Sequence, residues 1–200
     1  SLYQCTKTSN EKIPLPQTSG SISLATIGTK FPQLWIETEG WTSHKNRYRY
    51  NVQKKTFTTE NVTPVINYPE LEDVVVEEIE ITSHDGVQVP LSIIYKKGTV
   101  KNGHNRVLLN GYGCYNWINA PMLYPYLLYW IGEGGMYAVA HVRGGGEKGE
   151  QWHKGGYKAT KPNSWKDFIA CTEFLIDQKY TSPEKIAVWG GSAGGITIGR

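Results

Sequence analysis

The sequence predicts an α/β fold, in which a largely parallel β-sheet in the later part of the chain is covered by helices. Three observations lead to this prediction. From residue 74 onward, short apolar runs alternate with longer segments that carry a helical apolar stripe. The short runs are almost continuously apolar, which is typical of strands buried on both faces of a sheet. An Asp85-Gly86 pair between two extended runs predicts that the sheet opens with an antiparallel hairpin.

Residues 1–70 have a different character, because short bursts of β-branched and aromatic residues are separated by turn residues. In one burst, Tyr48, Tyr50 and Val52 alternate with polar residues, which is the period-2 pattern of a half-buried strand. We expect short strands of a sandwich, a barrel or a propeller blade, followed by a connecting segment at 62–73. The predicted strands are 21–28, 32–41 and 46–58.

The later region predicts strands and helices in alternation. The predicted strands are 74–82, 87–95, 106–110, 136–142 and 185–190. One helix is expected in the apolar stretch 121–131, and a second over 164–180. The apolar face of the second helix consists of Phe168, Cys171, Leu175 and Ile176. Ser164 and Asp167 resemble a capping box at its start.

The composition excludes several classes of function. The chain of 200 residues has a net charge of +3 and scattered basic residues, so neither a nucleic acid nor a membrane surface is expected as a partner. The 3 cysteines are far apart, which predicts free thiols and no metal site. No apolar run reaches the roughly 18 residues that a membrane helix needs. The N-terminus has no signal-peptide layout, and the location stays open between cytoplasm and periplasm.

Gly190-Gly191-Ser192-Ala193-Gly194 fits the pattern G-x-S-x-G, the nucleophile elbow. A sharp strand-to-helix turn would hold the serine in a strained conformation with its hydroxyl exposed, and small neighbours would avoid a collision. The Ala193 N–H, at a helix N-terminus, would donate to a developing oxyanion. The alternative is a structural glycine turn. The apolar strand directly before the motif favours a catalytic serine.

A second glycine turn, Gly111-Tyr112-Gly113, follows an earlier predicted strand. Ligands of α/β sheets bind at the carboxyl ends of the strands, and the partner of the elbow in the oxyanion hole comes from such a loop. The Tyr112 hydroxyl is neutral, because a phenol has a pKa of about 10. It would donate to the oxyanion where many hydrolases use a backbone N–H. Taken alone, Tyr112 would be assigned to packing, but the elbow favours the donor role.

A competing motif is the stretch 144–149, which matches G-x-G-x-x-G after a predicted strand. A dinucleotide site needs a helix that opens at those glycines, whereas residues 150–163 are expected to form a polar loop. The glycines around Ser192 also lack the lysine of a phosphate-binding loop. We therefore expect no nucleotide and no other cofactor.

Four segments taken together resemble the prolyl oligopeptidase family of serine peptidases. They are SHDGVQVPLSIIYKKG, NGYGCYN, AHVRGGGEKGEQWHKGG and YTSPEKIAVWGGSAGG, in this order along the chain. In that family a β-propeller caps an α/β-hydrolase domain. The resemblance implies that residues 1–70 are the end of the propeller with the return linker. Residues 71–200 would be the N-terminal part of an α/β-hydrolase catalytic domain, which is incomplete here.

The resemblance also implies an activity, the cleavage of short peptides through an acyl-enzyme by a monomeric enzyme of the prolyl or the basic-site type. Ser192 would be the nucleophile, and the Tyr112 hydroxyl and the Ala193 N–H the oxyanion donors. Tyr115 falls where the family places an aromatic residue that lines the pocket for the residue before the scissile bond. Cys114 departs from the glycine that is usual at its position.

Other interpretations stay open. They are a related carboxylesterase, an acylaminoacyl-peptidase, and a non-catalytic member that uses its propeller and hydrolase domains as an interaction surface. Arg143 and the glycines after it are expected to hold a loop near the site, without a part in the chemistry.

The sequence supplies no evident base for the serine. In α/β-hydrolases the chain order is Ser, then Asp or Glu, then His. All 5 histidines precede Ser192, and they are His44, His84, His104, His141 and His153. We therefore expect the chain to be a fragment that lacks the Asp and the His of the triad, and to show little hydrolysis by itself.

Overall fold

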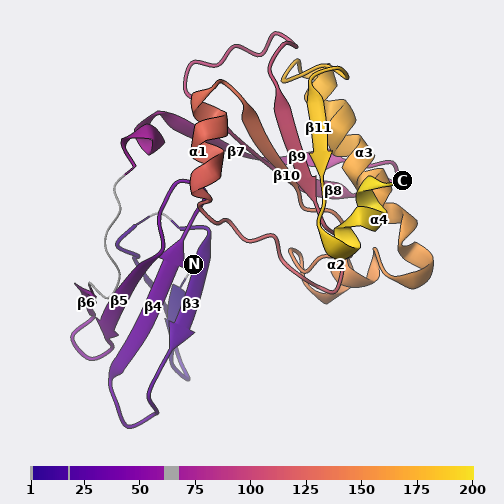
Figure 1. The fold of residues 1–200 in the computed structure, drawn as a ribbon. Helices are drawn as coiled ribbons and strands as arrows, with labels where there is room; N and C mark the ends of the chain where they lie inside the picture. The colour runs from indigo at the N-terminus through magenta and orange to yellow at the C-terminus, as the bar shows by residue number, and fades with distance from the viewer. Residues whose placement is uncertain (1, 18, 61–67) are drawn as a thin grey trace. The chain divides into compact units, whose positions relative to one another are not determined.

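The computed structural model describes residues 2–17, 19–60 and 68–200, and these form two compact units (Figure 1). The smaller unit comprises residues 1–71 together with 120–124, and the larger unit comprises residues 72–119 and 125–200. Within the predicted connecting segment, residues 62–67 lie outside the described part of the chain. Its end, Pro69–Asp73, forms the short 3₁₀-helix η1.

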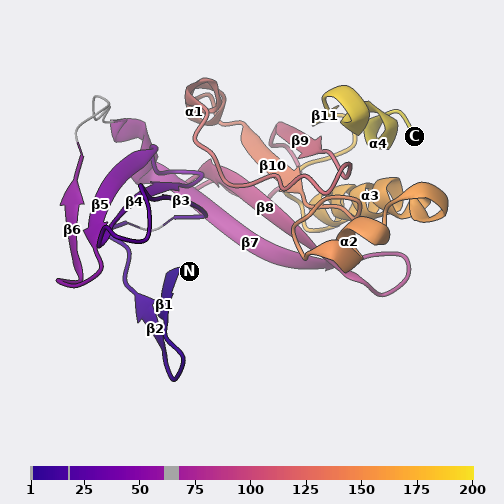
Figure 2. The same cartoon turned by 90° about the horizontal axis from the view of Figure 1, so that it is seen from below.

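The smaller unit consists of antiparallel strands. One sheet has the order β3-β4-β5-β6, and β1 and β2 form a separate hairpin (Figure 2). The strands are β1 (Leu2–Cys5), β2 (Asn10–Ile13), β3 (Ser21–Ala25), β4 (Gln33–Glu39), β5 (Asn46–Asn51) and β6 (Thr56–Thr59). Ile36 and Tyr50, on β4 and β5, are almost fully buried and cluster with Leu2 and Ile13 of the hairpin. These side chains form the core of the unit.

The segment 46–58, predicted as one strand, forms two strands joined by a turn. The side-chain oxygen of Asn51 accepts hydrogen bonds from the backbone N–H groups of Gln53 and Lys54 at 3.0 and 2.9 Å. An asparagine side chain that bonds the backbone in this way stabilises a turn. Lys55 completes the reversal with a φ of 53°. β5 and β6 therefore pair as a hairpin.

The larger unit contains a mixed sheet in the order β11-β9-β10-β8-β7. Its strands are β7 (Val74–Thr82), β8 (Gln88–Lys96), β9 (Val107–Gly111), β10 (Met136–Ala140) and β11 (Ile186–Trp189). β7 and β8 form the predicted antiparallel hairpin, and β8 is also antiparallel to β10 (Figure 2). β10, β9 and β11 run parallel to one another. Because Trp189 pairs with Asn110, the carboxyl ends of β11 and β9 lie side by side.

Helices cover both faces of this sheet. They are α1 (Pro125–Gly132), α2 (Glu150–Lys154), α3 (Pro162–Asp177) and α4 (Gly195–Ile198), with the 3₁₀-helices η2 (Lys158–Thr160) and η3 (Ser192–Gly194). Successive residues of a strand point to opposite faces. On β8, Leu91 and Ile93 belong to the core cluster that contains Leu175 of α3. Ile94 is buried on the opposite face, and α1 also contacts β8 and β10. The unit therefore has the predicted α/β class.

Both predicted helices are present, but they start at other residues than expected. α1 starts at Pro125 and not at residue 121. α3 starts at Pro162, in agreement with the preference of proline for the first helical turn. Ser164 and Asp167 consequently lie inside the helix, and both are fully buried. The predicted capping box is wrong, because these side chains bond to a distant part of the chain.

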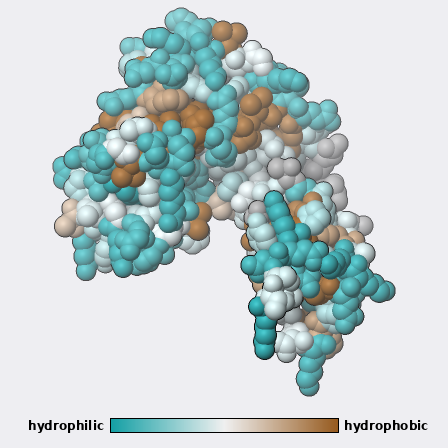
Figure 3. Space-filling model, turned by 180° about the vertical axis from the view of Figure 1, so that it is seen from behind, coloured by the Kyte–Doolittle hydropathy of each residue, from teal (hydrophilic) through white to brown (hydrophobic). Residues whose placement is uncertain are grey.

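The surface of the larger unit includes an exposed edge strand. β11 lies at the end of the sheet, and Val188 and Trp189 on it are 45% and 42% exposed. Figure 3 shows, on one face of the molecule, hydrophobic residues in patches between hydrophilic ones. None of the helices in the described ranges has the length and apolar character that crossing a lipid bilayer requires.

Candidate active site

Ser192 occupies a strained turn between a strand and a helix. β11 ends at Trp189, the chain passes Gly190 and Gly191, and Ser192 begins the 3₁₀-turn that continues into α4. Ser192 has a φ of 52°, in the left-handed region that residues other than glycine rarely adopt. Such a conformation costs on the order of 1–3 kcal/mol and persists only where the surroundings impose it. The serine is exposed, at the N-terminus of the turn.

The glycines around Ser192 differ in whether a Cβ atom would fit at their positions. A Cβ on Gly190 would lie 2.5 Å from Cγ1 of Ile198 and 2.9 Å from the Gly111 oxygen. A Cβ on Gly194 would lie 3.0 Å from both the Gly111 oxygen and Cδ2 of Tyr112. A Cβ on Gly191 would meet nothing within 4 Å, and its φ of −88° suits any residue. The expectation that small neighbours are required is therefore confirmed at two of these glycines and wrong at Gly191.

The segment from the last residue of β9 through the loop that follows, residues 111–117 (the Tyr112 loop), contacts the turn that holds Ser192. The hydroxyl of Thr197, on α4, donates to the Tyr112 carbonyl oxygen at 3.0 Å. The Cys114 thiol lies 3.5 Å from the Ala193 carbonyl oxygen. The two predicted loops thus meet at one edge of the sheet, where the parallel strands β9 and β11 end.

Tyr112 itself is half-buried beside this turn. Burial raises the pKa of its phenol above the ordinary value, and the neighbouring Cys114 and Tyr115 raise it further. At neutral pH the hydroxyl therefore keeps its proton and can donate a hydrogen bond. Tyr115 is 78% exposed, so its ring is open to a bound molecule. Tyr115 and the adjacent Asn116 both have a φ of 56°, which makes this loop a second strained segment.

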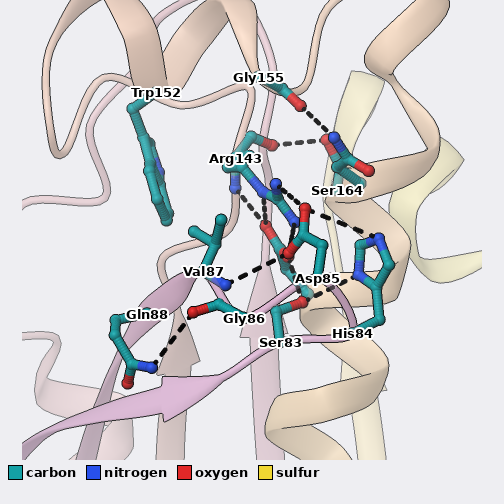
Figure 4. Close-up of polar contacts among 12 residues, drawn as sticks. Ser83, His84, Asp85, Gly86, Val87, Gln88, Arg143, Trp152, Gly155 and Ser164 are labelled. Carbon is teal, nitrogen blue, oxygen red and sulfur yellow. Dashed lines mark hydrogen bonds and ion pairs between the residues drawn. The ribbon is translucent and has the colours of Figure 1, made fainter.

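An ion-pair network in which Arg143 and Asp167 are buried lies next to the Tyr112 loop, and Arg143 is at its centre (Figure 4). The Arg143 guanidinium donates to Asp167 on α3 through Nε and Nη2 at 2.9 and 2.7 Å. It also donates to Asp85 of the β7–β8 turn at 2.6 and 3.1 Å. Asp167 further accepts a hydrogen bond of 2.6 Å from the Ser83 hydroxyl. The network joins the hairpin turn, the loop after β10 and α3.

The pKa values in this network follow from the pairing. The hydrogen bonds that Arg143 donates to Asp167 and then to Asp85 raise the pKa of its guanidinium, against the opposing effect of its burial. The hydrogen bond from Arg143 lowers the pKa of Asp85. Arg143 and Asp85 are thus both charged at neutral pH. The sequence predicted a holding role for Arg143 but missed Asp167, because its spacing from Ser164 imitated a capping box.

None of the histidines forms a hydrogen bond with Ser192 in the part of the chain that the structure describes. His141 is buried and lies 2.8 Å from the Ser92 hydroxyl through Nε2 and 3.6 Å from Glu147 through Nδ1. His153 contacts the backbone at Gly144 and Asn116 through Nδ1. In the same described residues, no three His, Cys, Asp or Glu side chains gather in a way that could hold a metal ion.

The competing glycine motif at 144–149 is filled by protein. A Cβ on Gly144 would lie 2.0 Å from the Gly113 oxygen, and one on Gly146 would lie 2.5 Å from the Asn116 oxygen. These glycines therefore let the Tyr112 loop pack closely. Residues 150–163, expected to form a loop throughout, are partly helical, since α2 spans Glu150–Lys154. α2 is only 5 residues long.

Comparisons with known proteins agree on one group of peptidases. The model of the prolyl oligopeptidase family matches residues 123–200. Protease 2 of Moraxella lacunata is 36% identical over 84% of the chain, and a prolyl endopeptidase of Elizabethkingia meningoseptica is 40% identical over 76%. A solved structure from a study of two prolyl endopeptidases superposes with a TM-score of 0.87 at 33% identity, over 94% of the chain. The chain spans 24%, 21% and 27% of the lengths of these three proteins.

Proposed function

Because the chain belongs to the prolyl oligopeptidase family of serine peptidases, we propose that it supplies the nucleophile and the oxyanion hole of an enzyme that hydrolyses short peptides. Ser192 is the nucleophile, and the Tyr112 hydroxyl and the Ala193 N–H are the oxyanion donors. One observation carries this proposal. Ser192 has a φ of 52° and is exposed between a strand and a helix, beside the Tyr112 loop.

The reaction is acyl transfer. The Ser192 oxygen forms a bond to the peptide carbonyl carbon while its proton passes to a base. The carbonyl oxygen becomes an oxyanion, to which Tyr112 and Ala193 donate. Collapse of this intermediate breaks the C–N bond, and the amine leaves with the proton from the base. Water then attacks the acyl-enzyme, which releases the acid and restores the serine.

The base and its orienting carboxylate come from outside residues 1–200 in this proposal. Each buried or partly buried histidine near the sheet already has partners of its own, as His141 does with Ser92. Residues 1–200 alone should therefore show little hydrolysis of amide or ester substrates. Turnover by these residues that Ser192→Ala abolishes would contradict this placement of the base.

The substrates are short peptides, and Tyr115 lines the pocket for the residue before the scissile bond. The exposure of its ring supports this role. The relatives named prolyl endopeptidase favour cleavage after proline. The product of the complete reading frame can be compared on proline-site peptides, basic-site peptides and short esters. A preference for the esters would mean that the protein is a carboxylesterase and not a peptidase.

The test of the proposal is covalent labelling of the complete protein with a fluorophosphonate. We expect one labelled residue, Ser192, and loss of both the label and the turnover in Ser192→Ala. Ser23→Ala, a change at an exposed serine of β3, is the matched control and should behave as the wild type. Labelling at another residue, or unchanged turnover in Ser192→Ala, would show that the nucleophile is elsewhere or that the protein is not a serine hydrolase.

A further inference from the structure

The backbone carbonyl oxygens of Tyr112 and Gly113 each accept a hydrogen bond from a side chain that lies elsewhere in the chain. The Thr197 hydroxyl donates to the Tyr112 carbonyl oxygen at 3.0 Å. The Lys161 ammonium donates to the next carbonyl oxygen, that of Gly113, at 2.5 Å. Thr197 comes from α4, directly after the elbow, and Lys161 immediately precedes α3. The Tyr112 loop is therefore fixed from two sides.

The surroundings of Thr197 and Lys161 hold both side chains in these hydrogen bonds. Thr197 is only 2% exposed, so its hydroxyl is shielded from water. The Lys161 ammonium also lies 3.1 Å from the Ser164 hydroxyl and 3.2 Å from the Cys114 sulfur. An ammonium has three N–H donors, and these three acceptors match them in number. The Ser164 hydroxyl in turn donates to the Arg143 carbonyl oxygen at 2.5 Å.

The loop needs such support because its backbone is strained. Tyr115 and Asn116, neither of them a glycine, each have a φ of 56°. Conformations of this kind persist only when the surrounding structure over-determines them. The torsion ψ of Tyr112 relates the direction of its carbonyl group to the direction of its Cα–Cβ bond. A hydrogen bond that holds the carbonyl therefore also limits the direction in which the phenol side chain leaves the backbone. A loss of either hydrogen bond would let the phenol move relative to the elbow.

We propose that Lys161 and Thr197 are positioning residues that set the place of the Tyr112 hydroxyl relative to Ser192. The inference rests on the proposed function, since the phenol matters only if it donates to an oxyanion. Neither side chain takes part in the chemistry. Each acts through the Tyr112 loop. A shift of about 1 Å in a catalytic group can lower the rate on the order of 100-fold.

The test uses the product of the complete reading frame with Lys161→Met and Thr197→Val, each alone and combined with Tyr112→Phe. We expect each single change to lower kcat roughly 10- to 100-fold with KM nearly unchanged. In the Tyr112→Phe background the same changes should lower kcat by less than about 3-fold, because the group that they position is gone. Thr197→Ser keeps the hydroxyl and should restore most of the activity.

Two controls match these variants in type. Lys166→Met removes an exposed lysine of α3, and Thr172→Val removes a hydroxyl that donates to the Phe168 carbonyl at 2.9 Å inside α3. Both should leave kcat unchanged. Equal losses in the two backgrounds, or no loss from either variant, would overturn the positioning role while Ser192 labelling still supports the peptidase. A wild-type protein whose Ser192 takes no label would overturn both.

Amide hydrogen exchange of residues 111–117 gives a readout that does not depend on activity. We expect faster exchange in Lys161→Met and in Thr197→Val, and no change in the two controls. Unchanged exchange in both variants would also overturn the inference, because the loop would then be held without these side chains.

Discussion

The segments that contain Tyr112 and Ser192 are brought together by two parallel strands, although 80 residues separate these two residues in the chain. Each lies just past the carboxyl end of its strand, β9 or β11. Tyr112 is held through its backbone, by Thr197 and by its neighbours, so its hydroxyl is free for a ligand as far as the described contacts show. This makes the hydroxyl a group that can be removed with little effect on folding.

Tyr112→Phe in the complete protein should lower kcat by a factor of about 100–1000, which corresponds to the loss of one oxyanion donor, or about 2.7–4 kcal/mol. KM and the melting temperature should change little, because the ring and its packing remain. Steady-state kinetics and thermal unfolding measure both. Tyr129→Phe, at a 76% exposed position of α1, is the matched control. A Tyr112→Phe enzyme with full kcat would remove the phenol from the mechanism.

Gly190 and Gly191 are neighbours with opposite steric surroundings, which gives a second test at this scale. Gly190→Ala would place a methyl group 2.9 Å from the Gly111 oxygen and should destabilise the turn by about 1–3 kcal/mol. Gly191→Ala enters open space and should be tolerated. Melting temperatures and the rate of fluorophosphonate labelling at Ser192 will separate the two. Equal effects of the two substitutions would mean that the turn does not have the backbone conformation described above.

At the scale of elements, the Arg143 network joins α3 to the β7–β8 hairpin and to the loop after β10. Asp167 accepts from Arg143 and Ser83 while it is fully buried. A buried pair contributes little compared with apolar residues of the same shape, but the removal of one partner leaves an unpaired charge. Asp167 is thus the position at which the attachment of α3 can be tested.

Asp167→Asn should lower the free energy of unfolding by about 3–5 kcal/mol, since the Arg143 guanidinium keeps only Asp85 as an ionic partner. Asp177→Asn, at the exposed last residue of α3, should have almost no effect. Chemical denaturation measures the difference. The double variant with Arg143→Met should lose less than the sum of the two single losses, because both partners of one interaction are gone. Additive losses would contradict the pairing.

At the scale of the whole molecule, the exposed edge of the sheet decides how residues 1–200 behave in solution. No further strand of the described residues pairs with the outer side of β11. Unpaired N–H and C=O groups beside exposed apolar side chains are a template for pairing with another chain. Two side chains, Val188 and Trp189, add apolar surface there.

Residues 1–200 expressed alone should therefore self-associate, and Val188→Lys should reduce this, because an edge lysine opposes strand pairing. Sedimentation velocity at several concentrations measures the effect. Val100→Lys adds the same charge at a 67% exposed loop position and should leave the association as it is. If both lysine variants behave alike, net charge and not the edge strand controls the association.

Local patterns in the sequence were enough to predict the α/β class, the β7–β8 hairpin and the strand–turn–helix setting of Ser192. These features depend on residues that are close in the chain, such as an Asp-Gly turn or an apolar run before a glycine motif. They also place Tyr112 at the end of a strand. The start of α3 was missed, since two residues of its buried face looked like a helix cap.

The tertiary structure alone decided which side chains hold the site in place. Arg143 meets Asp167 and Asp85 across 24 and 58 residues of chain, and Thr197 meets Tyr112 across 85. No periodicity or local motif specifies such contacts, because they depend on the order of the strands and on the packing of α3 and α4 against them. The strained backbone of Tyr115 and Asn116 in the Tyr112 loop is of the kind that persists where the surrounding structure over-determines it.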